Sequence, residues 1–305
     1  MIHCRMKKFL TLSFTLLFPA LASATGDPPM IMQEMLGQAM SRGMVTYPLY
    51  KGQLQLKVAP GYIVAKDSRS GLSNNLKGGA LTAAVTYGLS EHWSLAWMMG
   101  YAKESGSGVF GLAASGQPGQ QMQSLNVGAK ANGSFAGDDD GRGFVTSVNA
   151  VWDHWTGDNF RLPVYMGIGY LNLEEKVQNA ALGLRRKGTV SSPAVSLGVV
   201  PGVNLGELFR FTGFLLMTTP LDAGKGEVVD ETPLAGVTGA HRLDYKRPGG
   251  FEATVPILGV ELTYRPWGLS FGYTPAIEGA TSYSLQLTRR WGPKTAAEVG
   301  KGSAD

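Results

Sequence analysis

The chain has 305 residues, of which 42 are glycine and 10% are aromatic, and its formal net charge is +4. The single cysteine, Cys4, excludes an intramolecular disulfide and a cysteine-based metal site. Three basic residues, Arg5, Lys7 and Lys8, lie in the first eight positions, and no basic patch with interleaved aromatics follows. The charge therefore gives no reason to expect a nucleic-acid partner.

Residues 1–24 have the pattern of a cleaved export signal. A basic start precedes an apolar run over 9–18, and Ala22-Ser23-Ala24 is a small-residue cleavage sequence. The apolar run is shorter than the roughly 20 residues that a membrane-spanning helix needs. Cleavage would remove Cys4 and three of the 27 basic residues, which leaves 24 against 23 acidic ones and a net charge of about +1.

One helix is predicted in the next segment, 25–50. Over 28–44, Met32, Leu36 and Met40 approximate a single apolar stripe. If the rest of the chain encloses a lumen, such a helix is suited to plugging it or to capping its periplasmic mouth. We therefore assign 25–50 as an N-terminal periplasmic or plug segment.

From residue 51 to 291 the dominant pattern is an alternation of large apolar side chains with small or polar ones, which is typical of β-strands. In 93–101, for example, Trp93, Leu95 and Trp97 alternate with small or unbranched residues. One apolar face and one face rich in Gly, Ser, Thr and Gln favour a membrane barrel over a soluble sandwich. Alternating segments lie at 53–64, 81–89, 93–101, 124–131, 144–152, 160–170, 195–199, 209–217, 258–264, 269–273 and 283–288.

These eleven segments become twelve if 108–115 is also a strand, and single-chain bacterial barrels have an even number. Short connections then alternate with longer, polar ones, as expected for periplasmic turns and external loops. We predict an all-β fold, a transmembrane antiparallel up-and-down β-barrel of twelve strands, followed by a polar C-terminal tail at 292–305. Ten or fourteen strands remain open because 218–250 could hold a further hairpin. The short connections are 90–92, 116–120, 153–159, 201–207 and 265–267, and the others are 66–77, 104–107, 132–143, 173–189, 218–250 and 274–280.

Tryptophan positions favour the same topology. Five of the six lie beside a predicted periplasmic turn or at the end of the last strand. Indole rings favour the membrane interface, which accommodates both their apolar body and their N–H donor. The predicted aromatic girdle consists of Trp93, Trp152, Trp155, Trp267 and Trp291.

The segment 279–287, a glycine followed by alternating Tyr283, Leu285 and Leu287, resembles the C-terminal assembly signal of Gram-negative outer-membrane β-barrel proteins. The resemblance implies a place in the cell outer membrane, with the barrel-assembly machinery, outer-membrane lipid and lipopolysaccharide as partners. It departs from the family pattern in that Thr288–Trp291 and a polar tail follow the signal. The sequence YGLSEHWSLAW, at 87–97, also resembles hairpins in a transport-type family linked to phenol meta-pathway gene clusters.

Charged residues on the predicted inner face are candidates to line a lumen, where charge can set selectivity. Their positive excess hints at anionic solutes. We expect a passive channel or transport-type protein for a small-molecule solute. The alternatives are a structural or adhesive barrel acting through long external loops and a lipid-modifying enzyme. The lumen-lining candidates are Lys57, Lys130, Arg161, Arg210, Glu261 and Arg290.

No catalytic motif and no cofactor motif is visible, so we predict that the chain is not an enzyme. After residue 24 the histidines are His92, His154 and His241, and the first two fall in predicted periplasmic turns. A barrel hydrolase would need a histidine within reach of a serine and an orienting carboxylate or amide, and no local signature of that kind is present. The histidines are therefore interpreted as landmarks of topology.

An acidic run in a predicted external loop is a candidate for a metal site. Asp138, Asp139 and Asp140 offer carboxylates that suit Ca²⁺ or the divalent ions that bridge lipopolysaccharide. The sequence DDDGRG lacks the ligand spacing and the distal glutamate of an EF-hand. A solvated acidic turn is favoured, and no metal is assigned.

Overall fold

The computed structural model describes residues 36–44, 49–67, 74–111, 134–156, 159–179, 184–221, 225–230, 241–246, 254–277 and 280–293. The predicted signal, nearly all of the polar tail, Lys130 and the segment 124–131 lie outside these residues. Within them, no helix is long and apolar enough to cross a membrane.

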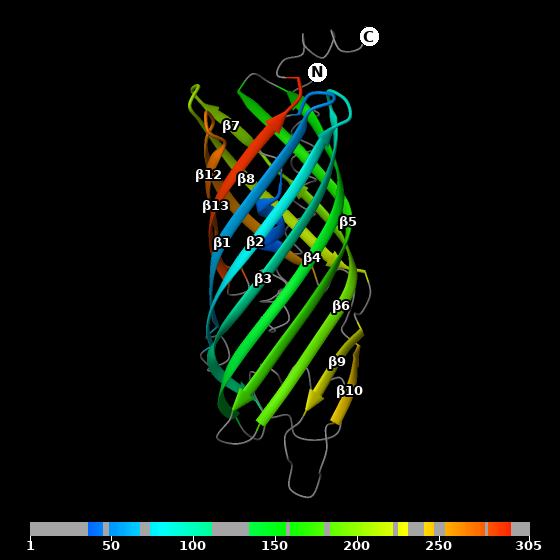
Figure 1. Ribbon diagram of the computed structural model, residues 1–305, viewed down its shortest axis with the longest axis vertical. Coiled ribbons are helices and arrows are strands. Elements are labelled where there is room, and N and C mark those ends of the chain that lie inside the picture. The colour runs from blue at the N-terminus through cyan, green and yellow to red at the C-terminus, as the bar shows by residue number, and fades with distance from the viewer. Residues whose placement is uncertain are drawn as a thin grey trace, which may run out of the picture.

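Ten antiparallel strands close into a barrel (Figure 1). Each strand pairs with its neighbour along the chain, β13 pairs with β1, and β6 pairs with β8 to complete the ring. The fold class is therefore confirmed as an all-β antiparallel barrel. In ring order the strands are β1 (Leu54–Asp67), β2 (Asn74–Gly88), β3 (Trp93–Gly111), β4 (Ser134–Thr156), β5 (Phe160–Asn179), β6 (Leu184–Val199), β8 (Phe209–Pro220), β11 (Val255–Tyr264), β12 (Leu269–Thr274) and β13 (Ala280–Trp291).

The three remaining described strands do not add a new position to the ring. β7 (Gly202–Leu205) continues β6 after a break at Val200 and Pro201, and it pairs with the same neighbours, β5 and β8. Proline cannot donate to a β-ladder, which accounts for the break. β9 (Lys225–Asp230) pairs with β6, and β10 (His241–Lys246) pairs with β9 and lies outside the ring.

Twelve strands are not confirmed, because several strands are longer than their apolar pattern. The predicted loop 104–107 and part of the predicted strand 108–115 belong to β3, and most of the predicted loop 132–143 belongs to β4. Much of the predicted loop 173–189 likewise belongs to β5 and β6. Backbone pairing continues where the outer side chains become polar, so an apolar alternation marks only part of each strand.

The two faces of the barrel differ as the alternation predicts. In β3, the outward-facing Leu95 and Trp97 are each 46% exposed, whereas the inward-facing Ala96 and Met98 are fully buried. The outer apolar stretch of this strand runs from Trp93 to Tyr101, which at ~3.3 Å per residue and ~40° tilt is roughly 20 Å tall. Beyond Tyr101 the outer face carries Lys103 and other polar residues.

Three tight turns lie at one end of the barrel, the end where β13 finishes (Figure 1). They occupy 90–92, 206–208 and 265–268, close to three of the predicted short connections. Gly206 and Gly268 have φ values of 68° and 63°, a left-handed conformation that glycine adopts without steric cost. We call this end the turn end.

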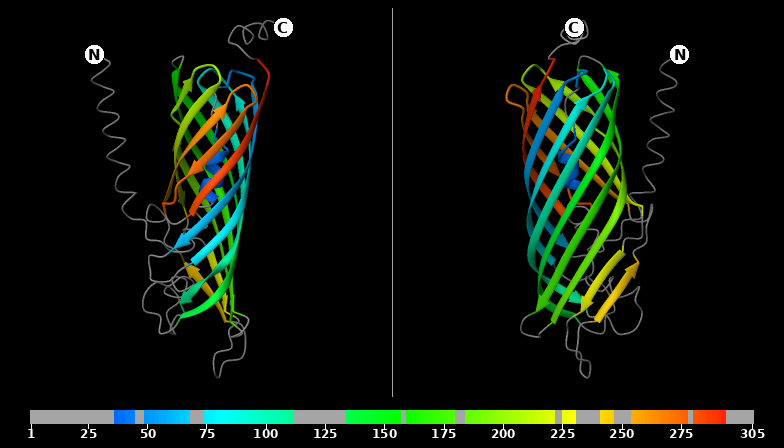
Figure 2. Two further views of the ribbon diagram at one scale, coloured as in Figure 1. Left: turned by 90° about the vertical axis from the view of Figure 1, so that its left-hand side faces the viewer. Right: turned by 45° about the vertical axis from the view of Figure 1, so that its right-hand side comes forward.

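A short helix over 36–42 lies inside the ring, as the two further views also show (Figure 2). The predicted N-terminal helix is therefore present in the part of 28–44 that is described. Residues 36–44, helical to 42, are called the lumen helix below.

Candidate functional site

Every residue of the lumen helix is buried. Its last turn closes through hydrogen bonds from the backbone N–H of Gly43 to the Met40 carbonyl (2.8 Å) and from that of Met44 to the Ser41 carbonyl (3.2 Å). The Ser41 hydroxyl donates to the Gln38 carbonyl at 2.9 Å. Some polar groups of the lumen helix are thus hydrogen-bonded within the helix itself, which suits a segment enclosed by the rest of the chain.

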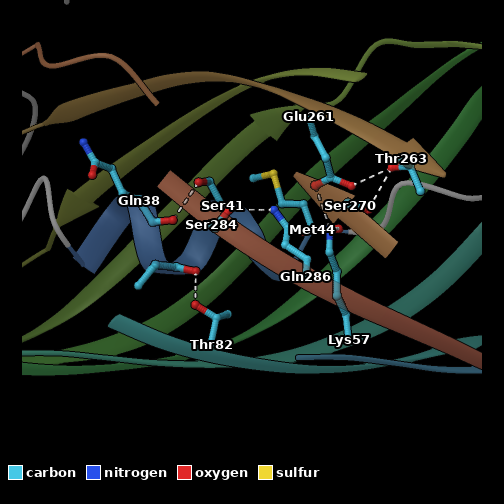
Figure 3. A network of polar contacts seen from close by, with 11 residues as sticks. Gln38, Ser41, Met44, Lys57, Thr82, Glu261, Thr263, Ser270, Ser284 and Gln286 are labelled. Carbon is cyan, nitrogen blue, oxygen red and sulfur yellow. Dashed lines mark hydrogen bonds and ion pairs between the residues drawn. The ribbon is translucent and has the colours of Figure 1, made fainter. Parts of the chain in front are cut away.

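One side of the barrel wall holds the lumen helix by hydrogen bonds (Figure 3). Gln38 Nε2 donates to the carbonyl of Ala280 in β13, and the Thr82 hydroxyl in β2 donates to the carbonyl of Ala39. Lys57 Nζ in β1 donates to the Met44 carbonyl at 3.1 Å. These bonds fix the helix against three adjacent strands of the ring.

Glycines of the wall make room for the helix. A Cβ added at Gly100 in β3 would lie 3.1 Å from the Cβ of Ala39, and one added at Gly143 in β4 would lie 2.8 Å from Leu36 Cδ1. At Gly61 in β1 an added Cβ would collide with the guanidinium of Arg42. The ends of the Leu36 and Arg42 side chains can shift, whereas the Cβ of Ala39 moves only with the helix itself. A larger side chain at Gly100 would therefore displace the helix, so part of the high glycine content serves this packing.

A buried ion pair lies where the helix ends. Lys57 Nζ and Glu261 Oε2 are 3.0 Å apart, and both side chains are almost fully buried. Glu261 Oε1 accepts a hydrogen bond from the Thr263 hydroxyl (3.0 Å), which in turn accepts one from Ser270 (2.9 Å). The structure therefore brings together two of the predicted lumen residues and surrounds them with hydrogen-bond partners (Figure 3).

The other described charged candidates lie toward the turn end. Arg161 Nη1 pairs with Asp153 Oδ2 at 3.0 Å. Arg210 is buried and donates to Asn204 Oδ1 at 3.0 Å, whereas Arg290 is exposed near the end of β13. Lys57, by contrast, bonds directly to the end of the lumen helix, and Glu261 pairs with Lys57.

Sequence reasoning missed Arg42. Its guanidinium is buried, and neither terminal nitrogen has a hydrogen-bond partner within the part of the chain that the structure describes. Nothing in the pattern of 28–44 marks this residue, because its burial depends on the surrounding barrel. Gln55, Thr86 and Thr288 were also missed, although period-two alternation places Gln55 on the same face as Lys57.

Tryptophans gather at the turn end. The rings of Trp93 and Trp152 stack with centroids 6.1 Å apart, and Trp267 meets Tyr264 edge to face at 5.4 Å. Trp291 is half-exposed at the end of β13. Of Trp155 the structure describes only the backbone, in β4. Of the described tryptophans, all but Trp97 thus lie at one end of the barrel, and Trp97 lies further along β3.

The acidic run does not lie in a loop as predicted. Asp138, Asp139 and Asp140 are part of β4, where their backbones pair with both β3 and β5. Asp138 and Asp140 are exposed, and Lys103 Nζ lies 3.7 Å from Asp140 Oδ1. No group of three or more His, Cys, Asp or Glu side chains within the described residues is arranged to hold a metal ion.

His92 lies in the predicted turn, between β2 and β3. Its side chain is exposed, and Nδ1 is 3.1 Å from the backbone oxygen of Asp153, so the residue connects this turn to the end of β4. His154 lies within β4 rather than in a turn, since the strand continues to Thr156. His241 begins β10.

No protein-family model matches the sequence, and no curated protein matches it. Solved structures resemble its fold. The translocator domain of autotransporter NalP from Neisseria meningitidis has a TM-score of 0.49 at 12% identity and covers 88% of this chain and 100% of its own. The outer-membrane protease OmpT from Escherichia coli scores 0.43 at 8% identity, with coverages of 81% and 97%. The toluene transporter TbuX from Ralstonia pickettii scores 0.40 at 9% identity, with coverages of 86% and 93%.

These three proteins have different activities, and no TM-score reaches 0.5, so none of their activities is transferred to this chain. The link to the phenol meta-pathway family is not confirmed. The described residues form a closed ten-stranded antiparallel β-barrel with a short helix inside.

Proposed function

We propose that the chain is an outer-membrane β-barrel that passes small molecules and that the lumen helix closes its passage. The outer apolar band and the tryptophans at the turn end support a membrane position. Polar side chains on the inner face support an aqueous interior once the helix is absent.

The observation that carries the proposal is that a separate segment fills the lumen. A narrow barrel can fill its interior with its own side chains. Here the wall has Gly61, Gly100 and Gly143 where it faces the helix, so the space is filled by residues outside the ring. A filling that is not part of the wall can leave without disrupting the strand pairing.

The proposal is tested by measuring ion conductance. We expect the full-length protein in planar bilayers to conduct little and a variant lacking 36–44 to conduct continuously. A matched control lacks the same number of residues from the polar tail, 294–302, and should behave like the full-length protein. Heat-modifiable migration in gels would verify that each barrel has folded. Equal conductance of the folded full-length and 36–44-deleted proteins would overturn the proposal.

We further propose outer-membrane localisation, with the barrel-assembly machinery, lipid and lipopolysaccharide as partners. Fractionation of the expressing cells after depletion of the assembly machinery tests this. Loss of the protein from the outer-membrane fraction is expected. Unchanged accumulation there would contradict a dependence on that machinery.

A structural or adhesive surface role is the second candidate. It is favoured by the continuation of β3–β6 beyond the apolar band, where their outer faces carry charged pairs such as Arg142–Glu174 (2.7 Å). Impermeability of both the full-length and the deleted protein, together with binding to cell surfaces, would support it. We expect no release of fatty acid from labelled phospholipid or lipopolysaccharide vesicles, and such release would instead support a lipid-modifying enzyme.

A further inference from the structure

One side of the lumen, formed by β3, β4 and β5, is mainly apolar. Ser147 and Asn149 interrupt it, but Asn149 Nδ2 donates to Ser147 Oγ at 2.8 Å, and Ser196 Oγ donates to Asn149 Oδ1 at 2.8 Å. The helix residues Leu36 and Ala39 contact this side. We call it the apolar wall, and its buried inward apolar residues include Ala96, Met98, Val145, Tyr165, Leu171 and Leu173. The charged residues Glu104 and Asp153 are also buried on these strands, toward opposite ends of the barrel.

The opposite side of the ring, β12, β13 and β1, carries hydroxyl and amide groups, and we call it the polar wall. Both side-chain amide atoms of Gln55 are buried and have no hydrogen-bond partner among the described residues, and the same holds for Gln286 Oε1 and Thr288 Oγ1. On the adjacent β2, the Thr86 hydroxyl is in the same state.

These atoms form one patch, because Gln55 pairs with Thr86 across β1 and β2, while Thr288 pairs with Lys57 across β13 and β1. A buried polar atom that makes no hydrogen bond raises the free energy of the folded protein. Water or a hydrogen-bonding solute would supply the missing hydrogen bonds and offset this cost. The patch offers both donors and acceptors and no formal charge.

The charges of the wall beside the helix are balanced. Lys57 is neutralised by Glu261 at 3.0 Å, and this pair stays in the wall if the helix leaves. Arg42 belongs to the helix and would leave with it. Glu104, toward the other end of β3, has an interaction of its own. Arg290 pairs with Gln55 across β13 and β1, at the edge of the patch, but it is exposed and also has an interaction of its own. Arg210 lies toward the turn end. An ion passing the polar wall would therefore lose hydration without meeting an uncompensated counter-charge.

We infer that the open lumen selects neutral small molecules with a hydroxyl- or amide-bearing face and an apolar face, as in alkyl or aryl glycosides. The inference rests on the proposed channel and specifies its solute. The hydrogen-bonding face of the solute contacts the polar wall, and its apolar face contacts the apolar wall. The lumen helix has the same division, with Leu36 and Ala39 toward one wall and Gln38 bonded to the other.

Solutes of equal size and different charge test the inference. The variant lacking 36–44 is placed in liposomes, with the membrane potential held at zero by potassium and valinomycin, and uptake of radiolabelled glucose, glucosamine and glucuronate is measured. Glucose should enter several-fold faster than either charged sugar, and phenyl glucoside should inhibit its uptake more than methyl glucoside does. Equal rates for glucose and either charged sugar would overturn the inference, as would equal inhibition by the two glycosides.

Wall variants locate the selectivity in the same deleted background. Gln55→Leu and Thr288→Val should lower glucose uptake several-fold relative to chloride conductance. Thr281→Val removes a hydroxyl from the outer face of β13 and should change neither quantity. If the two inner variants behave like Thr281→Val, the polar wall does not bind the solute.

The same experiment separates this inference from the proposed function. If the deleted protein passes chloride but treats the three sugars alike, the channel stands and the solute class fails. If it passes neither chloride nor glucose, the channel itself fails. The variant Ala39→Trp gives a second open form with an unchanged wall, because a tryptophan side chain is too large for the space at Gly100. If the deleted protein does not fold, the same chloride and sugar measurements are made on this variant.

Discussion

Replacing Lys57 with methionine should destabilise the barrel and release the lumen helix. The change leaves the Glu261 carboxylate buried without the cation that lies 3.0 Å away in the native protein. Breaking a buried pair in this way costs about 3–5 kcal/mol. It also removes the 3.1 Å hydrogen bond from Nζ to the Met44 carbonyl, and bonds from charged donors contribute about 1.5–3 kcal/mol. Since about 1.4 kcal/mol is a factor of ten, the helix should leave the lumen about tenfold more often or more.

A double-mutant cycle with Glu261→Gln separates the two effects. Urea unfolding in detergent micelles, followed by tryptophan fluorescence, gives the free energies of unfolding, and single-channel recording gives the open probability. The double variant should lose less stability than the two single variants together, because no charge stays unpaired. Open probability should rise in Lys57→Met and in the double variant. It should rise less in Glu261→Gln, where Lys57 still donates to Met44.

Two results would refute this reasoning. If Lys57→Met unfolds at the same urea concentration as the native protein, the ion pair does not contribute to stability as its burial implies. If its open probability matches that of the native protein, the bond to Met44 does not hold the helix in the lumen.

Three further substitutions probe other parts of the structure. Ala39→Trp should raise conductance to that of the 36–44 deletion, because Ala39 is fully buried against Gly100. A conductance as low as that of the native protein would show that the lumen tolerates the larger side chain. Trp93→Ala should lower the free energy of unfolding in lipid vesicles by about 0.5–1.5 kcal/mol, because the stacking on Trp152 is lost. The loss of an interfacial indole should lower it further. An unchanged free energy of unfolding would contradict the place of Trp93 at the interface. Arg142→Ala should leave the midpoint of urea unfolding nearly unchanged, since the Arg142 side chain that pairs with Glu174 is solvent-exposed. A clearly lower midpoint would mean that this surface is covered.

The sequence predicts which side chains face outward because alternation is a local property of a strand. Trp97 and Met98 are adjacent, and their spacing alone places one outside and one inside, as the structure has them. The turns at 90–92 and 265–268 are equally local, since each joins two short alternating segments.

The ends of the strands could not be predicted in the same way. Asp138 and Asp140 read as loop residues because they are charged, yet their backbones pair on both sides and their side chains face outward into solvent. Outside an apolar environment, a paired strand needs no apolar side chains. The sequence pattern therefore assigns the polar residues 104–107 to a loop and makes 108–115 a separate strand, whereas β3 runs continuously to Gly111.

The arrangement of the lumen depends on contacts between distant parts of the chain. A helix with an apolar stripe is visible in 28–44, but its bond from Gln38 to Ala280 spans 242 residues. The burial of Arg42 and the pairing of Lys57 with Glu261 likewise follow from ring closure. Local periodicity predicts which face each strand residue occupies, but not its partner across the lumen.

The most direct test of the closed lumen is a reversible lock on the lumen helix. A Cβ at Gly100 would lie 3.1 Å from that of Ala39, a few tenths of an ångström short of the separation of about 3.5–4.5 Å that a disulfide needs. The double variant Ala39→Cys with Gly100→Cys, expressed with Cys4 replaced by serine, should conduct little when oxidised and more after reduction, whereas each single cysteine variant should not respond to reductant. Conductance of the oxidised double variant equal to that of the 36–44 deletion, with the disulfide verified by mass spectrometry, would contradict closure of the barrel by its lumen helix.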